Sequence, residues 1–154
     1  MKKYLLVSIA VVVTAALSGA ASAGVITECG AMNGKAYYFQ NQLVPKLKGG
    51  GEWTDDKISG GQTILVMEGD KPRILYRDSV GLKDSVAEGG KAILVGNGPG
   101  HFVVIVMYGG AIEVYHFRLD ENGNGEVLLS SIKHDALVRK SSLMRAECRS
   151  PWKK

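Results

Sequence analysis

Short apolar runs separated by glycines form the main pattern of this sequence after its first two dozen residues. The runs are rich in Val, Ile, Tyr and Phe, which favour strands, and they span residues 63–67, 73–76, 92–95, 102–108, 111–119 and 126–132. Glycine pairs between them, such as Gly60-Gly61 and Gly89-Gly90, are typical of turns. This spacing predicts an all-β fold, a single small antiparallel barrel or sandwich of about seven or eight strands.

One hairpin can be predicted residue by residue. Gly109-Gly110 fits a two-residue loop in a primed turn, which needs positive φ angles. Counting outward from this turn places Val104 opposite Tyr115 and Phe102 opposite Phe117. Both faces of the hairpin are mostly apolar, whereas a strand pair with one wet face alternates. We therefore expect a central pair that is covered on both faces.

The remaining pattern defines an expected core and leaves one alternative open. The core positions are Ile64, Val66, Ile74, Tyr76, Ile93, Val95, Val104, Val106, Val114, Tyr115, Phe117, Val127 and Leu129. No segment holds a convincing helical period. The best candidate is Asp135 to Glu147, where Asp135 could cap a short helix.

The first 23 residues have the organisation of a secretory signal peptide. Two lysines precede an apolar run over residues 5–17, which is shorter than the roughly 20 residues of a membrane span. The run is followed by an A-x-A site, which predicts cleavage between Ala23 and Gly24. We expect residues 24–154 to form a single β-rich domain in the periplasm or the medium, with no membrane attachment after cleavage.

Cys29 and Cys148 are the two cysteines of the chain. In an oxidising compartment an even pair predicts a disulfide, and no C-x-x-C sequence favours a redox or metal pair instead. A bridge that closes so long a loop contributes about 4–5 kcal/mol in the chain-entropy model. It would hold the two ends of the mature chain side by side.

The charge balance argues against a nucleic-acid partner. The chain has a formal net charge of +4, from 19 Lys and Arg against 15 Asp and Glu, and signal cleavage removes Lys2 and Lys3, which leaves +2. The remaining cations do not gather into the basic stripe that nucleic-acid binding needs. We expect no nucleic acid among the partners of this protein.

The segment Asp120-x-Asn122-x-Asn124-Gly125 resembles the opening of a calcium loop, with oxygen ligands at alternate positions. The bidentate Glu of such a loop would fall on Ser131. Asn and Gly also suit a tight β-turn, because both tolerate left-handed geometry. We interpret this segment as a turn and keep it as a weak metal candidate.

His101 and His116 become diagonal neighbours on one face of the predicted hairpin. Two imidazoles at that separation could hold a borderline metal ion, although a catalytic metal normally has three protein ligands. No nucleophile motif or cofactor motif accompanies them, so we predict no catalytic residue and no cofactor. A small periplasmic enzyme or metal-binding protein with its site near His101 and His116 remains an alternative function.

Trp53 lies in a polar segment, Gly49 to Asp56, that we interpret as a loop with Trp53 at its tip. An exposed Trp is a typical interface anchor, and folding back as a lid on the core is the other interpretation. The leading functional hypothesis is a non-enzymatic binding or inhibitor-type module. Its partner would be a periplasmic or host protein, or a small apolar ligand. A structural envelope or stress protein is a further alternative.

Three segments carry a resemblance to known sequences: Ile58-Ser-Gly-Gly61, Glu113-Val-Tyr-x-Phe117, and Lys140-Ser-Ser-Leu-Met144 with the following Cys148. They are similar to a group of exported proteobacterial proteins that have the same size, the same terminal cysteine pair and no assigned activity. The resemblance implies one exported domain and no particular mechanism.

Overall fold

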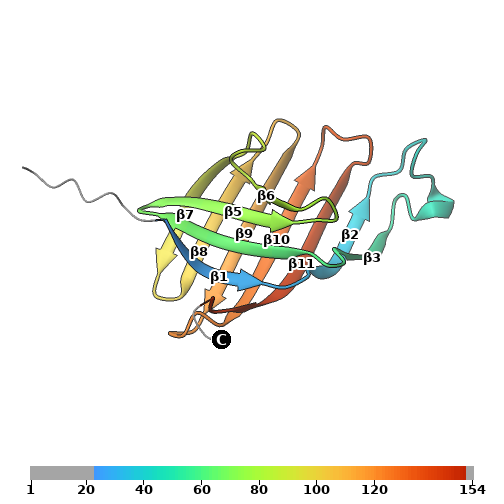
Figure 1. Ribbon diagram of the computed structural model, residues 1–154. Coiled ribbons are helices and arrows are strands. Elements are labelled where there is room, and N and C mark those ends of the chain that lie inside the picture. The colour runs from blue at the N-terminus through green and yellow to red at the C-terminus, as the bar shows by residue number, and fades with distance from the viewer. Residues whose placement is uncertain (1–22, 152–154) are drawn as a thin grey trace, which may run out of the picture.

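The computed structural model describes residues 23–151, which form an all-β, antiparallel fold, as the sequence predicts (Figure 1). The described strands are β1 (Gly24–Cys29), β2 (Asn33–Tyr38), β3 (Trp53–Lys57), β4 (Gln62–Glu68), β5 (Lys71–Arg77), β6 (Leu82–Asp84), β7 (Lys91–Gly98), β8 (His101–Met107), β9 (Ala111–Leu119), β10 (Gly125–Lys133) and β11 (Lys140–Arg149). One 3-10 turn, η1 (Lys46–Lys48), joins β2 to β3. The expected seven or eight strands are therefore too few for the eleven that form.

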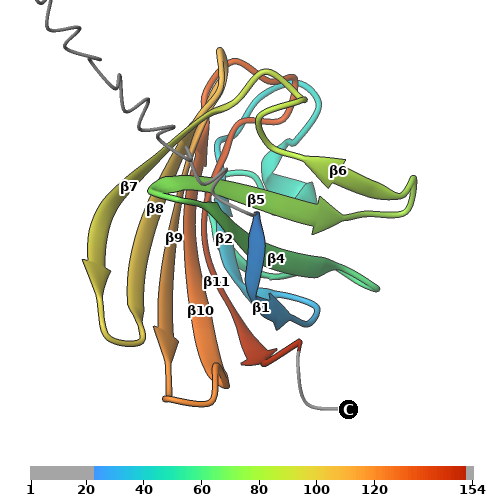
Figure 2. The same cartoon turned by 60° about the vertical axis from the view of Figure 1, so that its left-hand side comes forward.

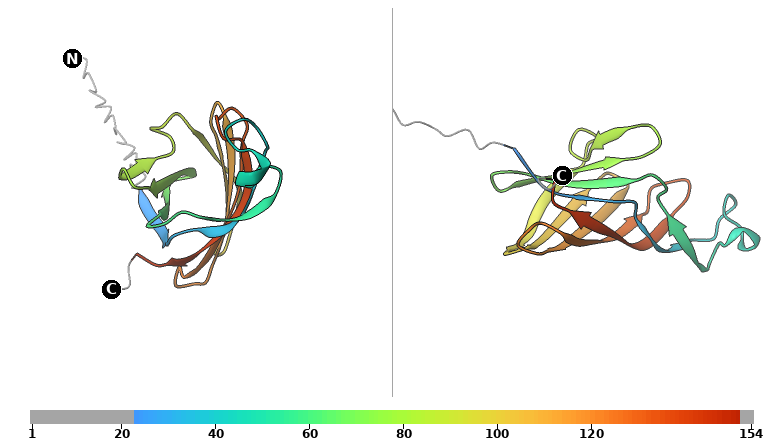
Figure 3. Two further views of the ribbon diagram at one scale, coloured as in Figure 1. Left: turned by 90° about the vertical axis from the view of Figure 1, so that its right-hand side faces the viewer. Right: turned by 60° about the horizontal axis from the view of Figure 1, so that its bottom comes forward.

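Nine strands follow one another in a strongly curled sheet, in the order β6-β5-β4-β1-β11-β10-β9-β8-β7. The sheet curls into a half-barrel (Figure 2; Figure 3, left). β5 and β7 come near each other, but no ladder joins them within residues 23–151. The concave face holds the core, whose fully buried apolar side chains include Leu65, Ile74, Val104, Val106, Phe117 and Val127.

The β8–β9 hairpin has the predicted register, with Val104 opposite Tyr115 and Phe102 opposite Phe117. The predicted turn geometry is wrong, because neither Gly109 nor Gly110 has a positive φ. A glycine at position 110 instead allows the turn to pack closely against Asp135. A Cβ atom there would lie 3.1 Å from the carbonyl oxygen of Asp135, and its own carbonyl accepts the backbone N–H of His134 at 3.0 Å.

The expectation that this hairpin is covered on both faces is also wrong. Ile112 of β9 and Ile132 of β10 are cross-strand partners on the convex face, and their side chains remain 41% and 49% exposed. Their contact with each other explains part of the apolar pattern, because cross-strand pairs of β-branched residues stabilise a sheet without a second layer.

Four expected core residues do not belong to the buried core. Val95 is 55% exposed, because β7 has a register shift between Leu94 and Gly96 and its inner positions are Ala92 and Leu94. A one-residue error of phase sends a whole strand to the wrong face. Ile93 and Val114 are only partly buried, and Tyr76 lines a cavity.

The C-terminal segment is the strand β11, so the helix considered for Asp135 to Glu147 does not form. Its buried positions alternate strictly, at Ser142, Met144, Ala146 and Cys148. β11 pairs with β10 along its whole length, with β2 over its first part and with β1 at its end.

The predicted disulfide between Cys29 and Cys148 is confirmed. The two residues are direct partners of the β1–β11 ladder and both are buried. The bridge therefore joins the first strand to the last. The predicted signal peptide lies outside the described residues except for Ala23, and β1 begins at Gly24, the residue expected to follow the cleavage site.

β2, β3 and the turn η1 extend beyond the edge of the half-barrel (Figure 1; Figure 3, right). We call residues 33–57 the arm. Among the described strands, β3 pairs only with β2. Trp53 is the first residue of β3 and faces Tyr37 across the ladder, so the expectation that it caps a loop tip is wrong.

Candidate functional site: a cavity inside the half-barrel

A cavity of about 510 Å³ opens among β4, β5, the β8–β9 hairpin and β10. Its size is within the range of about 300–1,000 Å³ that is usual for small-molecule sites. Apolar and aromatic side chains dominate its lining, including Met32, Ile58, Leu129, Tyr76, Tyr108 and Tyr115. The half-barrel is thus packed solid in one part and hollow in another.

The strand β9 contributes side chains both to the packed core and to the cavity. Its inward positions are Ala111, Glu113, Tyr115 and Phe117, because successive strand residues point to opposite faces. Phe117 is fully buried in the core, and its ring stacks on that of Tyr115 with centroids 6.3 Å apart. Tyr115, Glu113 and Ala111 then line the cavity.

Tyr115 and Glu113 form the best-defined polar contact of the cavity. The hydroxyl of Tyr115 donates to Oε2 of Glu113 at 2.8 Å. Burial raises the pKa of Tyr115 well above its ordinary value of 10.0, and the nearby Glu113 carboxylate raises it further. The phenol is therefore neutral at physiological pH and keeps the proton that it donates.

Tyr76 and Tyr108 complete a group of three neutral phenols. Burial is the main cause that raises the pKa of each, followed by the Glu88 carboxylate for Tyr76 and the Glu113 carboxylate for Tyr108. Neither hydroxyl has a hydrogen-bond partner among residues 23–151, where no fully buried side-chain oxygen or nitrogen is left unpaired. Both hydroxyls are therefore accessible to a molecule that enters the cavity.

Several charged groups also line the cavity. Asp78 is paired with Lys83 at 3.1 Å, and Nε of Arg77 donates to Gln62 at 3.3 Å. Glu113 is half-buried and belongs to no ion pair within the described part of the chain. Its carboxylate acts electrostatically on all three tyrosines.

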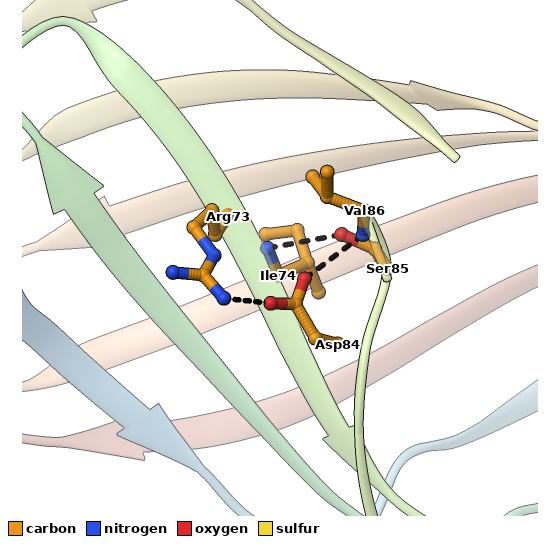
Figure 4. A network of polar contacts seen from close by, with 5 residues as sticks. All are labelled: Arg73, Ile74, Asp84, Ser85 and Val86. Carbon is orange, nitrogen blue, oxygen red and sulfur yellow. Dashed lines mark hydrogen bonds and ion pairs between the residues drawn. The ribbon is translucent and has the colours of Figure 1, made fainter. Parts of the chain in front are cut away.

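Polar contacts attach β6 and the segment that follows it to β5 (Figure 4). The guanidinium of Arg73 pairs with the carboxylate of Asp84, whose other oxygen accepts the N–H of Val86 at 2.9 Å. Burial alone would raise the pKa of Asp84, but these hydrogen bonds outweigh it and the net pKa is lowered. Ser85, fully buried, accepts the N–H of Ile74 at its hydroxyl.

The segment from Ser85 to Gly90 reaches Tyr108, a residue that does line the cavity. The N–H of Gly90 donates to the carbonyl of Ser85 at 2.8 Å, and a Cβ atom on Gly90 would lie 2.8 Å from the Tyr108 ring. The ion pair and the buried serine therefore position a tyrosine of the cavity through a segment that is otherwise loop.

The structure brings together His101 and His116 but keeps them away from the cavity. They lie on the convex face as diagonal neighbours, with the two Nε2 atoms 2.7 Å apart. One nitrogen must donate and the other accept, so this hydrogen bond occupies the two atoms that would bind a shared metal ion. Within residues 23–151 no group of three or more His, Cys, Asp and Glu has the arrangement of a metal site.

The candidate calcium segment forms the turn between β9 and β10. Oδ1 of Asp120 accepts the backbone N–H groups of Asn122 and Asn124 at 2.8 and 2.9 Å. Oδ1 of Asn124 accepts the N–H of Ser150 at 3.2 Å. These oxygens serve the turn and its attachment to the C-terminal segment.

Trp53 is 61% exposed and does not cover the core. Its ring meets that of Tyr37 edge-on at 5.7 Å, and Tyr37 meets Phe39 in the same way at 5.3 Å. Leu47, in η1, is fully exposed. The arm therefore presents a cluster of aromatic and apolar side chains to solvent.

The sequence interpretation missed the residues of the cavity. Glu113 was a visible signal, because it is a charged residue at an inward position of an otherwise apolar hairpin. Tyr76 and Tyr108 gave no such signal, since their meeting depends on how β5 and β8 approach across the half-barrel.

Comparison with family models, with curated proteins and with solved structures found no match for this chain. Among the described residues there is no helix with the length and hydrophobicity to cross a membrane. The cavity and the arm are therefore the features of this molecule that bear on its function.

Proposed function

We propose that this protein is an exported, non-enzymatic binding module that holds a small, largely apolar ligand in the half-barrel. The observation that supports the proposal is the cavity of about 510 Å³ lined by Met32, Ile58, Leu129 and three tyrosines. Concave, mostly apolar cavities with a few polar groups are the usual form of small-molecule sites. The buried disulfide is compatible with an oxidising compartment, and we place the protein in the periplasm or the medium.

Filling the cavity is expected to abolish binding of an apolar probe. Ala111 points inward and lines the cavity, so an Ala111→Trp side chain would occupy the space of the ligand. The neighbouring Ile112 points outward and is 41% exposed, which makes Ile112→Trp the matched control. The measurement is a fluorescence titration with N-phenyl-1-naphthylamine. We expect saturable binding by the wild type and by Ile112→Trp, and at least a tenfold loss for Ala111→Trp.

Failure of the wild-type protein to bind the probe would contradict the proposal. So would equal binding by the two tryptophan variants, because the probe would then sit outside the cavity. Circular dichroism and melting curves of both variants establish that any loss does not result from unfolding.

The arm supports a second candidate function, recognition of a periplasmic or host protein. Trp53 is exposed beside Tyr37 and Phe39 on a hairpin that extends from the sheet, and aromatic anchors dominate many protein interfaces. Trp53→Ala is expected to leave the melting temperature and probe binding unchanged but to abolish capture of a partner from periplasmic extract or host fluid. Unchanged capture by Trp53→Ala would exclude this role.

A further inference from the structure

We propose that the cavity is selective for a small amine, meaning a protonated ammonium group attached to an apolar body. This inference depends on the proposed function and adds to it the charge class of the ligand. It is carried by the placement of Glu113 among Tyr76, Tyr108 and Tyr115.

Glu113 brings a negative charge into the cavity. Its carboxylate lines a mostly apolar cavity and is in no ion pair within residues 23–151. A carboxylate in such surroundings is stabilised most by a cation that also donates hydrogen bonds. The hydroxyl of Tyr115 satisfies Oε2, and a carboxylate has acceptor sites left on both oxygens.

The three tyrosines of the lining also favour a cation. All three are neutral phenols close enough to Glu113 for its charge to act on them. Electron-rich aromatic rings attract an ammonium group, and the attraction grows where water is excluded. The open hydroxyls of Tyr76 and Tyr108 can also accept hydrogen bonds from an ammonium group.

The apolar residues of the lining determine the chemistry of the rest of the ligand. Met32, Ile58 and Leu129 line the same cavity, and Leu129 lies two positions before Ser131, the cross-strand partner of Glu113. An amine held at Glu113 would therefore have its hydrocarbon part against these side chains.

Two cationic side chains, Lys133 and Arg77, also line the cavity and would favour a ligand with a negative charge instead. Lys133 is on the inner face of β10, two cross-strand pairs beyond Ser131 and Glu113, and forms no ion pair with Glu113. Arg77 is held by Gln62. A ligand carboxylate would use these two residues, so the sign of the preferred charge distinguishes the two assignments.

The test uses three compounds that share one skeleton: 2-phenylethylamine, 2-phenylethanol and 3-phenylpropionate. Isothermal titration of the intact mature protein at pH 7 is expected to give the amine at least tenfold tighter binding than the alcohol. The carboxylate is expected to bind weakest. Equal affinities for amine and alcohol would overturn the inference, and a preference for the carboxylate would assign the cavity to Lys133 and Arg77 instead.

Glu113→Gln identifies the residue responsible. The amide oxygen of Gln can still accept the hydroxyl of Tyr115, so the variant removes the charge with little structural change. It is expected to lose the tenfold preference for the amine over 2-phenylethanol. Glu147→Gln, on the exposed face of β11, is the matched control and is expected to keep the preference.

The outcomes separate this inference from the proposed function. Binding of the neutral probe without any preference for the amine overturns the inference alone. Absence of binding by the probe and by all three compounds overturns both. An amine preference that survives in Glu113→Gln also overturns the inference, because Glu113 would not be its source.

Discussion

Replacing Cys29 and Cys148 together by alanine is expected to lower the free energy of unfolding by about 4 kcal/mol. The two cysteines are 119 positions apart in the sequence, so the bridge restricts most of the unfolded chain. A loss of this size corresponds to roughly 10–20 °C in melting temperature for a domain of this length.

The position of the bridge gives it a second effect. β1 pairs with β11 through only two residue pairs, Glu28 with Arg149 and Cys29 with Cys148, whereas its longer ladder is with β4. The disulfide therefore strengthens the short junction between the β6-β5-β4-β1 part of the sheet and the rest. Because residues of both parts line the cavity, we expect the double variant to lose affinity for the apolar probe even below its melting temperature.

Thermal denaturation followed by circular dichroism measures the first effect, and the probe titration measures the second. Intact mass of the wild type, exported and purified without reductant, is the control. It should equal residues 24–154 less two hydrogens, and a mass that still includes residues 1–23 would contradict the predicted signal cleavage. A double variant that melts within about 3 °C of the wild type would show that the bridge contributes little.

The sequence predicted those features that depend on neighbours in the chain or on residue type alone. The β8–β9 register follows from alternation about a two-residue turn, and the disulfide follows from an even pair of cysteines in an expected export context. The predicted turn geometry was wrong, because Gly110 packs closely against the backbone of Asp135, which belongs to a distant segment of the chain.

The strands β2 and β3, which the sequence did not predict, lack the apolar runs from which the other strands were predicted. β2 and β3 pair with each other beyond the edge of the half-barrel, so Asn33–Tyr38 and Trp53–Lys57 have few inward positions that must be apolar. The convex face had the opposite effect, since apolar residues that remain exposed there, such as Ile112, made the β8–β9 hairpin look covered on both faces.

The cavity could not be predicted for a related reason. Its polar centre needs the inner face of β5 to meet that of β8 and β9 across the curl of the sheet, and no local pattern encodes that approach. A polar inward residue such as Glu113 is the one part of the site that a strand pattern can reveal.

Gly100→Ala is expected to destabilise the protein by about 2–5 kcal/mol. Gly100 forms the turn between β7 and β8 with a φ of +64°, a left-handed conformation that costs an L-residue roughly 1–2 kcal/mol. A Cβ atom there would also collide with the carbonyl oxygen of Leu119. The collision cannot be relieved by a side-chain rotation, because both groups belong to the backbone and the carbonyl of Gly100 accepts the N–H of Leu119 at 2.7 Å.

Gly98→Ala is the matched control, two residues earlier at the end of β7. Gly98 does not have a positive φ, and a Cβ atom there would meet nothing within 4 Å. Its replacement should change stability by less than about 1 kcal/mol. Urea denaturation of the two variants tests the comparison. If both midpoints lie together near that of the wild type, the close approach between the β7–β8 turn and the end of β9 does not contribute to stability, and the register at that end of the half-barrel must differ from the one described.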